Sequence, residues 1–233
     1  MTSQGPITPL SKLPNFDPRK VPVDAVDRHL AAVAGADLSP EAIRQRFMAP
    51  PLWAPELHSE VRFTDRPPVH AAVLVPIVMR ARPSVLLTER TAHLVNHSGQ
   101  IAFPGGKVDA GDVDVSATAL REAQEEVGLD PALVQVLGVL PTYATGSAFI
   151  ISPVVALVAP NFQLSLNAGE VADAFEVPLD FLMNPANHRR HSVEWQGVRR
   201  EWLSMPYRDG STERFIWGAT AGMLRNFYRF LSA

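Results

Sequence analysis

The sequence predicts an α/β fold with a mixed sheet sandwiched between helices. Strand-like apolar runs precede a short amphipathic helix, similar runs follow it, and a second amphipathic helix closes the chain. The 233 residues are enough for one domain with an appendage and a sizeable core. The apolar share of 46% and the charged share of 19% are typical of an ordinary globular protein.

An N-terminal extension is expected over residues 1–67, ahead of a main domain over residues 68–233. Residues 1–22 contain five prolines and predict an extended arm. Two short helices are expected over residues 23–36 and 40–48. The second has a good start, with a serine cap followed by proline at the first helical position. Further prolines then predict an irregular connector up to the main domain.

The main domain consists mostly of strand-like runs separated by turn residues. Strands are expected over residues 71–79, 84–89, 134–143 and 148–158, followed by a late hairpin over residues 193–205 and 214–217. A short helix is expected at residues 178–183. The apolar periodicity of residues 219–231 predicts an amphipathic helix at the end.

A glycine-rich turn over residues 105–112, with the helix over residues 118–127, carries the most informative pattern. At 100° per residue the helix has two faces, an apolar one with Ala119, Leu120, Ala123 and Val127 and a polar one with Thr118, Arg121, Glu122, Glu125 and Glu126. Asp114 or Ser116 is expected to cap its start. Gly128 stands where a left-handed residue ends a helix.

The polar face of this helix predicts a metal site. Glu122 and Glu126 are four residues apart, so their Cβ atoms should lie about 5–6 Å from each other and both carboxylates can reach one ion. Without a cation, like charges at this spacing repel by roughly a few tenths of a kcal/mol. Carboxylate oxygens favour Mg²⁺ or Mn²⁺, and phosphates commonly complete the shell of Mg²⁺. The alternative is an acidic face that is only solvated.

Residues 106–129 resemble the signature of the Nudix family, hydrolases that split diphosphates linked to another moiety. The Arg-Glu-φ-x-Glu-Glu-x-Gly-φ half, where φ is aliphatic, matches from Arg121 to Leu129. The first half departs, because Asp112 stands where the signature has Glu and lies one residue further from Arg121. This offset resembles the coenzyme A diphosphatase branch of the family.

Two further segments resemble that branch. Residues 86–90 and 97–106 are similar to its Leu-Leu-Thr-x-Arg and Gly-x3-Phe-Pro-Gly-Gly motif. Residues 217–221 are similar to its C-terminal Trp-Gly-x-Thr-Ala. One position departs, since Val95 stands where the branch has a basic residue, which removes one potential phosphate contact.

The resemblance implies a Nudix-type α/β/α sandwich over about residues 68–231 and a metal-dependent diphosphatase. Its substrate would be coenzyme A or acyl-CoA, cleaved to 3′,5′-ADP and 4′-phosphopantetheine or the acyl form. A different nucleoside-diphosphate-linked substrate, such as ADP-ribose or NADH, is the alternative within the enzyme class. A Nudix module that binds a nucleotide without cleaving it is the alternative of another class.

Within the helix, the resemblance implies that Glu122 and Glu126 are the main ligands of Mg²⁺ or Mn²⁺. Glu125 would contribute directly or through water. The backbone carbonyl of Gly106 would be a further ligand, because glycine lets the backbone approach closely. Arg121 would hold a glutamate in place, and a plain ion pair to Glu125 would make the same contact.

Outside the helix, Glu170 is the second carboxylate of interest, either as metal ligand or base, or simply as a solvated loop residue. The expected substrate contacts are Arg90, His97, Gly105 and Gly106, and His93 flanks the same motif. A surface or capping role is the alternative for both histidines. Asp109 and Asp112 are expected to shape the turn.

Composition limits the partners. The net charge of −3, without a basic stripe, argues against bulk nucleic-acid binding, so a small-molecule substrate is expected. The absence of cysteine excludes disulfides, thiolate zinc sites and a cysteine nucleophile. No apolar run approaches the roughly 18 residues of a membrane span, and no signal pattern opens the chain. A cytoplasmic setting is expected, and a homodimer is left open.

Overall fold

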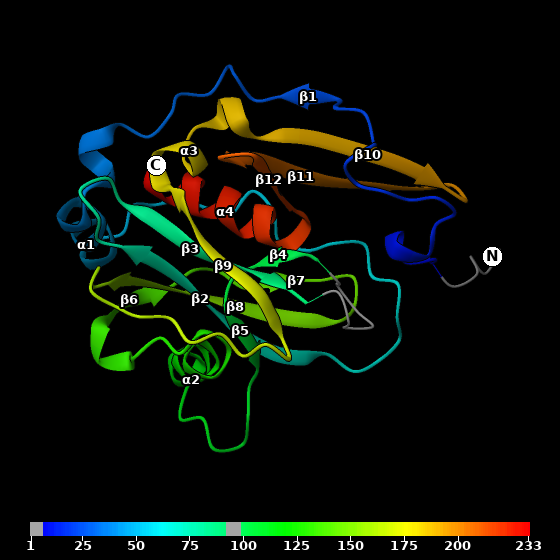
Figure 1. Cartoon of the computed structure of the whole chain (residues 1–233). Coiled ribbons are helices and arrows are strands. Elements are labelled where there is room, and N and C mark those ends of the chain that lie inside the picture. Colours follow the sequence, from blue (N-terminus) through cyan, green and yellow to red (C-terminus); the bar gives the residue numbers. More distant parts are fainter. Residues whose placement is uncertain (1–6, 92–98) are drawn as a thin grey trace.

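An eight-stranded mixed sheet forms the centre of the fold in the computed structural model, which describes residues 7–91 and 99–233 (Figure 1). Its strands are β2 (Val69–Val78), β3 (Ser84–Arg90), β4 (Ile101–Ala102), β5 (Gly105–Lys107), β6 (Val134–Val139), β7 (Tyr143–Ala144), β8 (Phe149–Val158) and β9 (Val171–Pro178). The main strand order is β4-β3-β2-β8-β6. In addition, β5 pairs with β2, β7 with β8 and β9 with β3.

Strand β2 organises this sheet. It runs parallel to β8 over its whole length, and the other pairings between the named strands of this sheet are antiparallel. Its first half also pairs with β5 and its last two residues with β3. A parallel pair needs a long crossover, and the chain between β2 and β8 includes α2 (Val115–Val127).

Helices cover both faces of the sheet because its strands alternate. Along β2, Val73, Val75 and Ile77 belong to one core cluster, whereas Ala72 and Leu74 belong to another. The first cluster includes α4 (Gly218–Leu231) and the second includes the apolar side of α2. Figure 1 shows α2 and α4 on opposite sides of the sheet. The predicted α/β/α sandwich is therefore confirmed.

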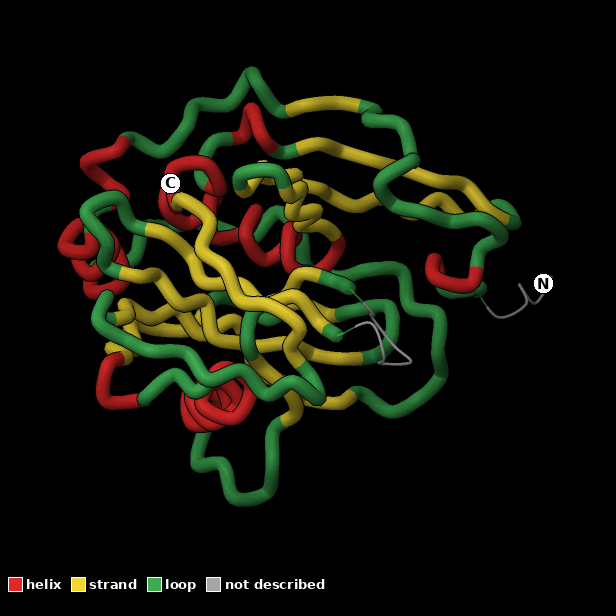
Figure 2. Tube along the Cα trace, viewed as in Figure 1, coloured by secondary structure: helices red, strands yellow, loops and turns green. Residues whose placement is uncertain are grey.

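A second, four-stranded antiparallel sheet packs beyond α4 (Figure 2). Its strands, in spatial order, are β1 (Ala25–Val26), β10 (Arg189–Trp195), β11 (Val198–Asp209) and β12 (Thr212–Trp217). The sequence predicted one strand over residues 193–205, and this is wrong. The chain reverses at Gln196 and Gly197, whose φ angles of 53° and 74° are those of a two-residue hairpin turn.

The predicted helix over residues 23–36 is also wrong. Residues 25–26 instead form β1 against β10, and a 3₁₀ turn, η2 (Gly35–Leu38), follows. Pairing with a distant strand overrides local helix propensity here. The helix predicted over residues 40–48 is confirmed as α1 (Pro40–Met48), where Ser39 Oγ accepts from the Ala42 N–H at 3.2 Å. The division at residue 67 stays a prediction.

The remaining elements are short. They are η1 (Leu10–Lys12), η3 (Pro131–Leu133), α3 (Leu179–Leu182) and η4 (Pro185–Asn187). Strand β9 was not anticipated from the sequence, and the single strand expected over residues 134–143 is divided into β6 and β7. Over residues 7–91 and 99–233, no helix is long and apolar enough to cross a membrane.

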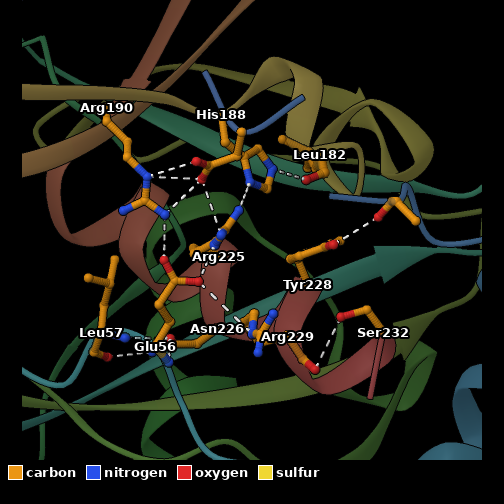
Figure 3. A network of polar contacts seen from close by, with 12 residues as sticks. Glu56, Leu57, Leu182, His188, Arg190, Arg225, Asn226, Tyr228, Arg229 and Ser232 are labelled. Atoms are coloured by element: carbon orange, nitrogen blue, oxygen red, sulfur yellow. Dashed lines mark hydrogen bonds and ion pairs between the residues drawn. The ribbon is translucent and has the colours of Figure 1, made fainter. Parts of the chain in front are cut away.

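A buried polar network fastens the N-terminal extension to α4 (Figure 3). Arg225 is 1% exposed and donates from Nε to Glu56 at 2.7 Å, and its Nη2 lies 3.1 Å from Asp27. Arg190 of β10 donates to the same two carboxylates. Glu56 and Asp27 belong to the extension, so both charges are neutralised only when the extension lies against the main domain.

Candidate active site

Helix α2 carries three glutamates, and its contact with the central sheet includes β2 and β5. Asp114 caps its start, accepting from the Ala117 N–H at 2.8 Å, and Gly128 ends it with a φ of 69°. Both predicted helix ends are thus confirmed. Glu126 differs from expectation, because it is only 3% exposed although the helical periodicity placed it on the polar face. Strand β5 covers this part of the face.

Strand β5 brings the backbone of two glycines against these acids. Gly105 pairs with Val73 and its N–H donates to Glu126 Oε2 at 3.1 Å. A Cβ atom on Gly106 would lie 2.5 Å from the carboxylate of Glu122. Only glycine permits this approach, so β5 and α2 together form a close backbone-to-carboxylate contact.

Arg121 lies among four carboxylates. Its guanidinium is 2.9 Å from Asp112, 2.9 Å from Glu122, 3.2 Å from Glu125 and 3.7 Å from Asp109. It also donates to the backbone carbonyl of Lys107 at 3.1 Å. The expected pairing with Glu125 is confirmed, and the bidentate contact with Asp112 is an addition. These bonds, together with the neighbouring carboxylates, raise the pKa of Arg121, so it stays charged.

Asp112 holds the glycine-rich turn together. Besides Arg121, it accepts from the Thr118 hydroxyl at 2.8 Å and from the Asp109 N–H at 2.9 Å. The bonds from Arg121, then those from Asp109 and Thr118, hold the pKa of Asp112 well below its usual range. The expected turn-shaping role is thus supported by geometry. Its role as the anchor of Arg121 was not anticipated, although an acid at the position of a signature glutamate could have suggested it.

The loop with Glu170 is tethered to both α2 and β3. The Asn167 N–H donates to the backbone carbonyl of Glu126 at 2.9 Å, and the Thr91 N–H donates to that of Glu170 at 3.0 Å. The Asn167 side chain donates to Glu170 Oε1 at 3.2 Å. Arg90 lies on the same side, with Nη1 3.9 Å from Glu126 Oε1. Four segments of the chain therefore meet at one place: α2, the end of β3, the loop with Glu170 and, through Gly105, β5.

The sequence also singled out His93, Val95 and His97. These three residues lie outside the residues that the structure describes. Of the predicted substrate contacts, Arg90, Gly105 and Gly106 lie beside the acidic face of α2.

Burial and mutual repulsion make two of the acids hard to ionise. Burial is the main cause that raises the pKa of Glu126 to about 7, and the charges of Glu122 and Glu170 act in the same direction. The Gly105 N–H and Arg90 oppose this rise. Burial likewise raises the pKa of Glu122, with Arg121 opposing it and the charges of Glu125 and Glu170 adding to it. A cation between these side chains would stabilise their charged forms and lower both pKa values.

The donor set suits a hard divalent cation. Within the described part of the chain, no three acidic or histidine side chains already converge on one point, since Glu125 is turned to Arg121 and Glu126 to Gly105. The oxygens are nevertheless those that such a cation prefers, and Gly106 supplies room for the backbone beside Glu122. Glu122 and Glu126 are two residues that could hold such a cation.

Comparison with known proteins gives consistent matches. A family profile described as NUDIX domain matches residues 68–196. A Citrobacter koseri protein named "Uncharacterized Nudix hydrolase NudL" is 44% identical over 156 residues, which cover 66% of this chain and 79% of the relative. A protein of the same name from Escherichia coli O7:K1 is 42% identical with the same coverage.

Two solved structures are more distant. An Ap4A hydrolase from C. elegans shares 22% identity over 47% of this chain and 80% of that chain, with a TM-score of 0.41. The NUDIX domain of Shewanella oneidensis NrtR, solved with ADP ribose, shares 20% identity over 49% and 75%, with a TM-score of 0.39.

Proposed function

This chain belongs to the Nudix family and is a pyrophosphohydrolase, and on this premise we propose that it cleaves the diphosphate of coenzyme A or acyl-CoA. The products would be 3′,5′-ADP and 4′-phosphopantetheine or its acyl form. Nudix hydrolases act with a divalent metal ion, and we propose Mg²⁺ or Mn²⁺ for this one, because carboxylate oxygens prefer these ions.

One spatial relationship carries the proposal. Arg90 belongs to the motif that resembles the coenzyme A branch, and Glu126 belongs to the Nudix motif. They are 36 positions apart in the printed sequence, yet Arg90 Nη1 lies 3.9 Å from Glu126 Oε1. Because the two motifs share one site, a diphosphate bound at the acids would lie within reach of a cation that the branch motif supplies.

We propose that Glu122 and Glu126 hold the metal, with Glu125 and the backbone carbonyl of Gly106 as further ligands. When bound, the metal supplies positive charge to the phosphates and lowers the pKa of a bound water. The chain then has to keep its acids in place. Arg121 holds Glu122 and Glu125, while the Gly105 N–H orients Glu126.

The bond changes follow from the reaction class. A water oxygen bonds to one phosphorus, and the bond between this phosphorus and the bridging oxygen breaks, so the bridging oxygen leaves with the other phosphate. In the proposal Glu170 accepts the proton that the water releases, and Arg90 together with the backbone of Gly105 and Gly106 positions the diphosphate. The closeness of Glu170 to the site is supported by two backbone hydrogen bonds, from Asn167 to the Glu126 carbonyl and from Thr91 to the Glu170 carbonyl.

A second substrate class has one observation in its favour. Val95 stands where the branch motif has a basic residue, so one potential contact to a phosphate is missing. ADP-ribose or NADH is then the alternative substrate. A non-catalytic nucleotide-binding module is less well supported, because all three helix glutamates are present.

Initial rates with coenzyme A, ADP-ribose and NADH, each with Mn²⁺ or Mg²⁺, test this proposal. We expect coenzyme A to be cleaved fastest, with 3′,5′-ADP as the nucleotide product on chromatography. Faster cleavage of ADP-ribose or NADH would replace the coenzyme A assignment. Absence of turnover with every substrate, together with measurable nucleotide binding, would favour the non-catalytic module.

The setting of the enzyme is also part of the proposal. The lack of cysteine is compatible with a cytoplasmic location, and the expected partner is a small-molecule substrate. A homodimer stays a prediction.

A further inference from the structure

We propose that Arg214, on β12 of the second sheet, is a positioning residue for the substrate-binding side of the active site. It acts through Glu89, which directly precedes Arg90 in β3, and through Asp173, which follows the Glu170 loop in β9. This inference rests on the proposed function of that site, and it adds a residue that neither motif contains.

Arg214 connects the second sheet to two strands of the central sheet, β3 and β9. Its Nη1 donates to Glu89 Oε2 at 2.8 Å and its Nη2 to Asp173 Oδ2 at 2.5 Å. Its guanidinium carbon also lies 4.0 Å from the centre of the Phe175 ring. The side chain is 11% exposed. Such a fork-like, desolvated contact fixes both carboxylates in direction as well as in distance.

The two acids need this cation because they face each other. Glu89 on β3 and Asp173 on β9 are directly opposed in the antiparallel register. Like charges at opposed positions push the strands apart. Among the described residues, Arg214 is the only cation within 4.0 Å of either carboxylate. Without Arg214, this cross-strand pair would therefore be repulsive.

The pair lies where the ladder becomes irregular. The register shifts between Glu89 and Arg90, so that Arg90 pairs with Val171 rather than with the next residue in order. Beyond this point the strands are held by the bond from the Thr91 N–H to the Glu170 carbonyl. A bulge re-aims the side chains that follow it. The ion pairs of Arg214 thus hold Glu89 and Asp173, the last residue pair before the register shifts next to Arg90.

Arg80 provides a control at the far end of β9, although its side chain is 42% exposed against 11% for Arg214. It too is an arginine that pairs with a β9 carboxylate, Glu176 at 2.7 Å, and it too lies over a ring, Phe162 at 5.3 Å. Its pairing lies away from Arg90 and Glu170. Comparison of Arg214→Gln with Arg80→Gln therefore separates loss of one ion pair on β9 from loss of position at the site.

The test measures kcat and KM separately, together with the Mn²⁺ concentration for half-activation. We expect Arg214→Gln to raise KM about tenfold, because small displacements of binding groups cost this much or more. The Mn²⁺ requirement should change less than about twofold, because Arg214 does not touch the acids of α2. Arg80→Gln should keep the wild-type KM, and Arg214→Lys should be intermediate because it keeps the charge but loses the fork.

A triple variant tests whether repulsion between Glu89 and Asp173 causes the loss. Adding Glu89→Gln and Asp173→Asn to Arg214→Gln removes the repulsion, so KM should return most of the way to the wild-type value. An unchanged KM in Arg214→Gln, an equal loss in Arg80→Gln, or no recovery in the triple variant would each overturn the inference.

The outcome does not depend on coenzyme A being the substrate. The same variants are compared on whichever diphosphate the wild-type chain cleaves fastest, so a wrong substrate assignment leaves the comparison intact. Calorimetric Kd values for ADP-ribose without metal give a readout that needs no turnover. There, too, Arg214→Gln should bind more weakly than Arg80→Gln, and equal affinities would count against the inference.

Discussion

The guanidinium of Arg121 reaches back nine residues to Asp112, donating from Nε at 3.0 Å and from Nη2 at 2.9 Å. Bidentate pairs of this kind are among the strongest side-chain contacts. Asp112 belongs to the glycine-rich turn and Arg121 to α2, so this contact fixes the turn against the helix. The same guanidinium holds Glu122 and Glu125.

Asp112→Asn is expected to lower kcat/KM by about tenfold or more, as removal of a partner that orients metal ligands commonly does. The amide cannot accept the bidentate contact, so Arg121 would draw on Glu122 and Glu125 instead. Rates measured over a Mn²⁺ titration should show a higher half-activating concentration. Asp109→Asn is the control, because this acid is 69% exposed and lies 3.7 Å from Arg121. Equal losses in both variants would contradict the anchoring role.

Gly106→Ala is expected to reduce kcat by about a hundredfold, since small misplacements of catalytic groups have effects of this size. The new methyl group would lie 2.5 Å from the Glu122 carboxylate and has to displace it. Gly111→Ala, in the same turn, meets nothing within 4 Å and should retain activity. Circular dichroism of both variants would show whether the fold survives. Full activity of a folded Gly106→Ala variant would argue against this contact.

Glu126→Gln is expected to reduce turnover by more than about a hundredfold, because it removes a proposed ligand of the metal. Glu125→Gln should cost less, because Glu125 is 58% exposed and bound to Arg121. A second readout is the rise in melting temperature on adding Mn²⁺, which should be present in wild type and lost in Glu126→Gln. If that rise persists in Glu126→Gln, the cation binds elsewhere.

His188 should contribute a loss of stability as the pH drops below 6.5. Glu126 contributes in the opposite direction, because its raised pKa makes the folded protein bind a proton before the unfolded chain does. The side chain of His188 is buried; its Nε2 donates to the Leu182 carbonyl at 2.7 Å and its Nδ1 accepts from Arg225 at 3.0 Å (Figure 3). Burial is the main cause that lowers its pKa from 6.5 to about 4. Between these values His188 binds a proton in the unfolded chain but not in the folded protein, so its contribution to the free energy of unfolding decreases as the pH falls.

A pKa shift of this size corresponds to roughly 3 kcal/mol, at 1.36 kcal/mol per unit. His188→Gln should remove this loss, so that between pH 6.5 and 4 the free energy of unfolding falls less, or rises more, as the pH drops than it does in wild type, measured by urea denaturation. His70→Gln, at an exposed histidine, should leave the slope of unfolding free energy against pH as in wild type. A slope unchanged in His188→Gln would contradict the role given to His188.

Asp27 and Glu56 act in the lower part of the pH range. Burial works to raise the pKa of Asp27 and of Glu56, but the hydrogen bonds and charges of Arg190 and Arg225 outweigh it, and both pKa values are lowered. Their contribution to stability is present above the pKa values of the unfolded chain and is lost as the pH falls through those of the folded state. The pH range in which His188 acts therefore lies mostly above the range in which Asp27 and Glu56 act.

Elements with complete local signals were predicted correctly. The ends of α2 follow from Asp114 and Gly128, which satisfy terminal backbone groups within the helix itself. Strands β2, β3 and β8 follow from uninterrupted buried runs. Two of the failures share another cause, because β1 exists only where β10 offers an unpaired edge and β9 only where it meets β3.

The sequence by itself determined which chemistry the site offers: the spacing of Glu122 and Glu126, the glycines before them and the helix that carries them. These features follow from the conformational preferences and the spacing of residues that are close together in the sequence. Only the tertiary structure decided that Glu126 is buried, that Arg90 and Glu170 come beside it, and that Arg214 holds the acids next to them. Burial and charge depend on segments far apart in the chain, and only packing brings these together.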